Sequence, residues 1–225
     1  MEAKIGKSYL TKIPHEGGKL TFQYPAFKGT FGDVAEQIDK EWLKRPTSPE
    51  IASLVYDAWK NPKGEYESEV LDILRKNWIW EFTGNFYLPK SNDEINNGVI
   101  IEYNPRVVNG RLSMDKNYLV KRLNENDPNV RFVPFGYKIE GQTPKELEKN
   151  PYIVARYGEE GAEKIAEIAS KHSSNPYLWS FGSVDKETVR VSVLNGNFNG
   201  SGLNVDGDGR DDNNNGYSFG VRVAD

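Results

Sequence analysis

The last 38 residues of the chain, Thr188 to Asp225, differ sharply in composition from the rest. They contain no Lys, Glu, Gln, Met or Trp, although the preceding 187 residues hold 19 Lys and 20 Glu. Asn, Gly, Asp and Ser take their place, so the segment carries short polar side chains. Asn and Gly suit turns that need positive φ, and a polar terminus of this kind can also be disordered.

The two flanks of this segment favour order. Apolar and polar residues alternate over 189–193 and again over 219–223, and a period of two is typical of half-buried strands. We therefore predict a long loop held between two strands. A connection of more than about twenty residues is uncommon unless it is functional.

A family resemblance lies in the same residues. The Asn-rich run and the phrase that ends it, Asn215-Gly-Tyr-Ser-Phe-Gly-Val-Arg-Val-Ala224, resemble the C-terminal variable region of proteins diversified by diversity-generating retroelements. These proteins have C-type lectin folds, related to the fold of formylglycine-generating enzymes. In that family, error-prone reverse transcription replaces template adenines, and Asn codons are favoured targets. Such replacement in an Asn codon never yields Lys, Glu, Gln, Met or Trp, which is the set missing here.

The resemblance covers about the last forty residues and implies both a fold and a function. It implies one α+β domain over residues 1–225 with a C-type lectin-like fold, mixed helices, mostly antiparallel strands and a long Asn/Gly-rich variable loop region. The implied function is receptor-like or adhesin-like binding of a protein or cell-surface ligand, without enzymatic activity. The variable ligand-binding region would span about 190–222. Its candidate ligand-binding residues are Asn195, Asn197, Phe198, Asn199, Ser201, Asn204, Asp206, Asp208, Arg210, Asp211, Asp212, Asn213, Asn214, Asn215, Tyr217 and Ser218.

Composition excludes several other functions. A net charge of -4 and a pI near 5.4 argue against binding of nucleic acid through bulk electrostatics. No stretch of 18 consecutive apolar residues occurs, and the first residues lack an apolar signal core. We therefore expect a soluble chain without membrane insertion or a signal peptide, and the sequence does not define its location further.

Cysteine is absent, which excludes disulfides, thiolate metal sites and a cysteine nucleophile. The chain differs in this from animal C-type lectins and from formylglycine-generating enzymes, whose activity uses cysteines. The segment 204–215 resembles a calcium loop, with Asn or Asp at positions 1, 3, 5 and 9 and Gly at position 6. Position 12 is Asn215 where a bidentate Glu normally completes the shell. We expect no metal and no cofactor, and a calcium-dependent carbohydrate-binding lectin remains an alternative.

An enzyme is the other alternative, either of the formylglycine-generating type or a glycan hydrolase that uses acidic residues. Glu81, Glu102 and Glu140 lie in or near aromatic strand segments, where burial could raise a pKa. Glu on a strand is more often an exposed partner of Lys or Arg, and we expect that here. The two histidines, His15 and His172, lack metal-ligand spacing.

Periodicity predicts the remaining elements. Strands are expected near 19–24, 78–82, 98–103, 130–135, 177–181, 189–193 and 219–223, and helices around 34–42, 51–59, 70–74, 119–123, 143–150 and 162–171. Capping boxes at Thr47–Glu50 and Thr143–Glu146 predict two helix starts. Trp42 and Trp59 are assigned to the buried faces of their helices, and Trp179 to the core. Phe219, Val221, Arg222 and Val223 are expected to hold the backbone of the variable region.

Overall fold

The computed structural model describes residues 8–196 and 202–222. The strands are β1 Ser8–His15, β2 Gly18–Tyr24, β3 Phe27–Gly29, β4 Trp78–Leu88, β5 Gly98–Tyr103, β6 Arg106–Val108, β7 Arg111–Ser113, β8 Val130–Pro134, β9 Glu140–Gly141, β10 Tyr177–Trp179, β11 Thr188–Gly196, β12 Leu203–Gly209 and β13 Gly216–Ser218. The helices are α1 Phe31–Lys40, α2 Ser48–Lys60, α3 Glu65–Lys76, α4 Lys116–Asn124, α5 Pro144–Glu148 and α6 Pro151–Ala169. This mixture of helices and strands confirms the α+β class.

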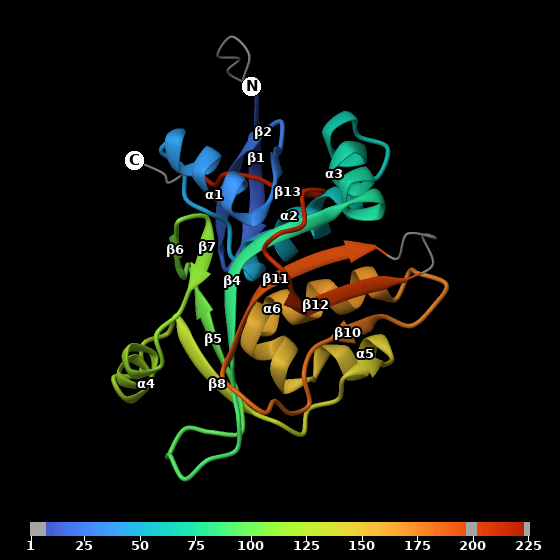
Figure 1. Ribbon diagram of the computed structural model, residues 1–225. Helices are drawn as coiled ribbons and strands as arrows, with labels where there is room; N and C mark the ends of the chain where they lie inside the picture. Colours follow the sequence, from blue (N-terminus) through green and yellow to red (C-terminus); the bar gives the residue numbers. More distant parts are fainter. Residues whose placement is uncertain (1–7, 197–201, 223–225) are drawn as a thin grey trace.

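Within the described ranges, a nine-stranded mixed sheet organises the molecule (Figure 1). The strand order is β3-β13-β4-β11-β12-β10-β9, and β5 and β8 continue the sheet from the far half of β4. The long strand β4 pairs antiparallel with β11 and β5 and parallel with β13. Two short hairpins, β1-β2 and β6-β7, lie outside this sheet.

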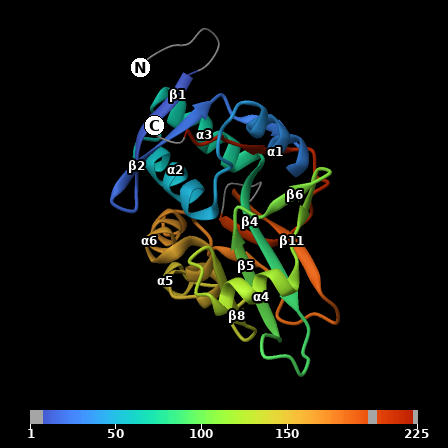
Figure 2. The same cartoon turned by 90° about the vertical axis from the view of Figure 1, so that its left-hand side faces the viewer.

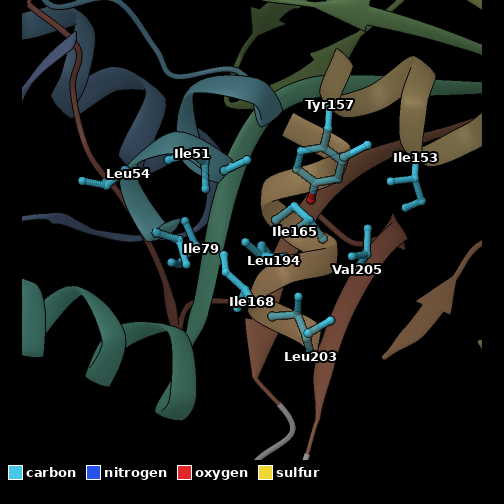
Figure 3. Packing of buried hydrophobic residues seen from close by; sticks show 14 of the residues in the cluster. Ile51, Leu54, Ile79, Ile153, Tyr157, Ile165, Ile168, Leu194, Leu203 and Val205 are labelled. Carbon is cyan, nitrogen blue, oxygen red and sulfur yellow. The ribbon is translucent and has the colours of Figure 1, made fainter. Parts of the chain in front are cut away.

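The larger core lies between the sheet and helices α2 and α6 (Figure 3). Ile79, Leu194 and Val205 project from β4, β11 and β12 into this core, and none of them is exposed to solvent. They meet Ile51 of α2 and Ile165 of α6 in the same cluster. Burial of branched apolar side chains on both sides gives this layer most of its stabilisation.

Other helices cover the opposite face of the sheet in part. Phe31 and Ile38 of α1 pack with Trp80 and Val193 in a second cluster. A third cluster lies farther along β4 and β5, where α4 crosses β5 and β8 (Figure 2). Neither the second nor the third cluster includes a residue of β10 or β12.

Several local predictions are confirmed. The helices α2 and α5 begin directly after Thr47 and Thr143, as the capping boxes predict. At α5 the amide of Glu146 donates to Thr143 Oγ1 at 3.3 Å, and the amide of Thr143 donates to Glu146 Oε2 at 2.7 Å. Strand β5 has the predicted bounds.

The prediction of a long loop is wrong, because the segment after β11 contains the strands β12 and β13. Strand β12 has a low intrinsic β propensity, but pairing with β11 and β10 stabilises it, and tertiary context overrides propensity in such strands. The last predicted strand is displaced as well. Pairing occurs at Gly216–Ser218, and Val221 forms only isolated bridges, to Phe22 and Lys44.

Two tryptophans also differ from their predicted places. Trp42 follows the end of α1, has a φ of 57°, and is 95% exposed. Trp179 is 46% exposed and is therefore no core anchor. Among the described residues, no helix is both long enough and apolar enough to cross a membrane.

Candidate functional site

The strand β12 separates two kinds of residue by its alternation. Leu203 and Val205 are fully buried against the α6 side, whereas Asn204, Asp206 and Asp208 are only half-buried on the other side. Successive side chains of a strand point to opposite faces. The Asn/Asp half of the segment is therefore presented on one face while the apolar half builds the core.

Gly207 fixes this orientation of β12. A Cβ atom built at Gly207 would lie 1.8 Å from the hydroxyl oxygen of Tyr152, in the space where that hydroxyl packs against the strand. Tyr87 donates a hydrogen bond to the carbonyl of Gly207 at 2.8 Å. A larger residue at this point would push β12 away from α6, so glycine is required by the close approach.

Strand register places two aromatic residues beside these polar groups. In the parallel pair of β10 and β12, Tyr177 pairs with Asn204 and Trp179 pairs with Asp206. The rings of Tyr177 and Trp179 contact each other with centroids 4.3 Å apart, while Leu178 between them is buried on the other side. We call the group Tyr177, Trp179, Asn204, Asp206 and Asp208 the β10–β12 face.

The electrostatics of the β10–β12 face centre on Asp206. Burial, followed by a hydrogen bond to the side chain of Asp208 and repulsion from its charge, raises the pKa of Asp206 to about 8. The main-chain amide of Asp208 also donates to Asp206 Oδ1 at 3.1 Å. Two carboxyl groups held this close favour the state in which one of them keeps its proton.

A buried ion pair supports the strand from behind. Arg156 of α6 bonds Glu81 of β4 at 2.5 Å, and neither side chain is exposed. The guanidinium also donates to the carbonyl of Asp206 at 2.8 Å and to that of Val193 at 3.0 Å. Burial alone would lower the pKa of Arg156, but the neighbouring Tyr157 and Glu81 hold it above its usual value. This network fixes β11 and β12 relative to α6.

The turn after β12 borders two cavities. A cavity of about 650 Å³ lies between α1, the β6-β7 hairpin and this turn, and a second of about 400 Å³ lies beside β11. Asp211 and Asp212 line both cavities, and Arg210 lines the smaller one. The rest of the turn, Asn213 to Asn215, includes a local bond from the amide of Asn215 to Asn213 Oδ1 at 2.9 Å.

Two of the residues predicted to bind ligand are buried instead. Asn195 is 6% exposed and accepts a hydrogen bond from the side-chain amide of Asn204 at 2.9 Å. Ser218 is fully buried and donates to the carbonyl of Trp80 at 2.8 Å. Both contacts stabilise strand pairing, so the prediction of exposed binding residues is wrong at these two positions.

The structure does not bring all the predicted residues together. Tyr217 lies on β13, which β4 and β11 separate from β12, and its ring is covered by the ammonium group of Lys28 at 5.3 Å. At about 4.8 Å per strand, three steps across the sheet span roughly 14 Å. Asn197, Phe198, Asn199, Ser201 and the framework residue Val223 lie outside the described residues.

The segment 204–215 does not form the calcium loop that its sequence resembles, because Asn204 to Gly209 are extended in β12. Among the described residues, no group of three or more His, Cys, Asp or Glu side chains is placed to hold a metal ion.

The three strand glutamates do not form a common site. Glu81 and Glu102 are buried, with relative exposures of 0% and 6%, and each pairs with an arginine, Arg156 and Arg122 respectively. The expectation of exposed partners is therefore wrong for both, and only Glu140 is exposed. Burial raises the pKa of Glu102, against the effect of Arg122.

Sequence reasoning missed Tyr177 and Trp179 as members of the site. The alternation Tyr177-Leu178-Trp179 already placed the two aromatic residues on one face of a strand. The pairing of β10 with β12, which lies more than twenty residues away along the chain, could not be read from that alternation.

Comparison of the chain with protein-family models, with curated proteins and with solved structures finds no match in any of the three.

Proposed function

We propose that this protein is a receptor-like or adhesin-like ligand-binding protein that displays a diversifiable surface on a rigid C-type lectin-like scaffold. The observation that carries the proposal is the alternation in β12. A single Asn/Gly/Asp-rich segment supplies buried frame residues and outward polar residues in strict alternation. Substitution of the outward residues should leave the packing of Leu203 and Val205 unchanged, which is what a diversified binding surface needs. Asn204 has a second role, because its side-chain amide donates to the buried Asn195.

The composition of the segment fits this role. Asn and Asp offer adaptable hydrogen bonding, and exposed Trp and Tyr offer rigid contact area at a low entropic cost. The β10–β12 face combines both kinds of residue on paired strands. Strands of a supported sheet position such groups more rigidly than a free loop would.

Two observations favour binding over glycan hydrolysis. The carboxyl group of Asp208 is close enough to raise the pKa of Asp206, whereas the two carboxyl groups of glycosidases stand about 5 to 9.5 Å apart. The buried glutamates Glu81 and Glu102 are occupied by arginines rather than directed at a cavity.

Matched libraries test the proposal. One library would vary Asn204, Asp206 and Asp208 to the residues that adenine replacement in Asn codons allows, and the control would vary Leu203, Val205 and Gly207 in the same way. Both would be displayed on yeast and scored for folding by resistance to protease. We expect most members of the first library to stay folded and most of the second to unfold. Equal loss of folded protein in both libraries would contradict the proposed surface.

The DNA beside the gene tests the origin of the diversity. We expect a near-copy of the sequence encoding about residues 190–222 close to a reverse transcriptase gene, with differences confined to adenines of the copy. A complete locus without both features would exclude retroelement diversification, while the library experiment would still test whether the outward face of β12 tolerates substitution.

A further inference from the structure

The β10–β12 face combines an exposed aromatic ring with paired carboxyl groups on the neighbouring strand. We propose that this face binds a cationic side chain, the guanidinium of arginine or the ammonium of lysine, from a basic segment of a partner protein. This inference rests on the proposed function, because it assigns a ligand class to the same surface.

Register supplies the geometry. Trp179 and Asp206 are direct partners across β10 and β12, so their side chains leave the sheet on the same face. Paired strands are about 4.8 Å apart, and a cation attracted to an aromatic face lies within about 6 Å of the ring centre. One cation can therefore contact the ring of Trp179 and a carboxylate of Asp206 or Asp208 together.

The charge of the face is uncompensated on its outer side. Among the described residues, neither Asp206 nor Asp208 forms a salt bridge. Arg156 lies on the opposite side of β12, where it bonds the carbonyl of Asp206 and the carboxylate of Glu81. A ligand cation would supply the missing positive charge, and a partly desolvated position makes that interaction stronger than it is in water.

Proton linkage distinguishes this ligand from a neutral one. Two charged groups act on Asp206: Asp208 on its own strand raises its pKa, and Arg156 on α6 lowers it. Together with burial, which raises it most, they bring the pKa of Asp206 to about 8. A cation favours the ionised carboxyl group, so its binding releases a proton at neutral pH. A sugar that stacks on Trp179 and Tyr177 would bind without this release.

The test uses the full chain and a hexa-arginine peptide in isothermal titration calorimetry. If binding requires ionised Asp206, the affinity should rise by up to about fiftyfold between pH 6 and pH 8 at constant salt. Titrations in buffers of different ionisation enthalpy should show proton release on binding. Hexaglutamate and a neutral cello-oligosaccharide serve as comparison ligands and should not bind.

Variants assign the effect to the face. Asp206→Asn should weaken peptide binding and abolish its pH dependence, and Trp179→Ala should weaken binding roughly 2- to 30-fold with the pH dependence kept. Asp185→Asn removes one exposed acid from the connection between β10 and β11 and should change neither property. Asp208→Asn is the second carboxylate variant if Asp206→Asn does not fold.

Three results would overturn the inference. They are no binding of the peptide, equal loss of binding in Asp206→Asn and Asp185→Asn, and binding of the oligosaccharide with no pH dependence. None of these results contradicts the proposed function if the library at Asn204, Asp206 and Asp208 stays folded. Failure of the cation-binding inference can therefore be told apart from failure of the proposed function.

Discussion

Single residues of the Asn/Gly-rich segment have opposite roles although their types are similar. Gly207 lies where no side chain fits, and Asn195 is buried in a hydrogen bond to Asn204. Asp206, one position from Gly207, faces outward and keeps a titratable group with a raised pKa. Residue type alone therefore does not separate frame from surface in this segment.

Gly207→Ala should destabilise the protein by about 1 to 3 kcal/mol or more, because its Cβ would overlap the hydroxyl of Tyr152 and force β12 or α6 to move. Gly18→Ala is the matched control, since a Cβ at Gly18 meets only the carbonyl of His15, at an ordinary 3.5 Å. Urea unfolding of both variants measures the difference. Equal effects at the two glycines would contradict the close packing at Gly207.

Asp206 should make stability depend on pH in a defined window. Its pKa is raised from 3.8 to about 8 in the folded protein. The folded state therefore binds more protons than the unfolded state between these values, and the contribution of Asp206 to stability is full below about pH 4 and is lost as pH rises through about 8.

Asp206→Asn removes this titration, so the stability of the variant relative to the unchanged protein should increase from pH 4 to pH 9. The free energy of unfolding in urea at several pH values measures it. Asp185→Asn should keep the pH dependence of the unchanged protein. A constant difference between Asp206→Asn and the unchanged protein across this range would show that the pKa is not raised.

At the scale of the element, β12 depends on its neighbours. Its seven residues include two glycines, and pairing with β11 and β10 together with packing on α6 keeps it extended. Half of its side chains contribute little to that packing. The packing that stabilises β12 is therefore concentrated on one of its two faces.

Leu203→Ala should cost about 2 to 5 kcal/mol, because the side chain is fully buried and its removal leaves a cavity. Asp208→Ser, on the outward face, should change stability by no more than about 0.5 kcal/mol. Chemical denaturation of the two variants at one pH compares the faces directly. A loss above about 2 kcal/mol for Asp208→Ser would show that the outward residues form a structural network instead.

At the scale of the whole molecule, one buried ion pair connects the layers. Arg156 of α6 contacts Glu81 of β4 and main-chain carbonyls of β11 and β12, and Ser48 at the start of α2 donates to Glu81 at 2.8 Å. Every buried polar side-chain atom of the described residues has a partner. The pair thus sets the position of β12 relative to both covering helices, α2 and α6.

Arg156→Leu should destabilise the fold by about 3 to 5 kcal/mol, because it leaves the buried carboxylate of Glu81 without its counter-charge. The double variant with Glu81→Leu should recover part of that loss, since it removes both charges. Equilibrium unfolding of the single and double variants provides the comparison. If Arg156→Leu alone is as stable as the unchanged protein, the ion pair does not hold the layers together.

The sequence alone determined the α+β class, the approximate positions of the six described helices and of six of the thirteen described strands, and two helix starts, because periodicity and capping are local properties. It also marked the Asn/Gly/Asp-rich segment as unusual. Only the tertiary structure decided that part of this segment is a strand, that Asn195 and Ser218 are buried, and that Trp179 is exposed beside Asp206. The physical reason is that strand pairing and burial depend on residues far apart in the chain, and local propensity carries no information about them.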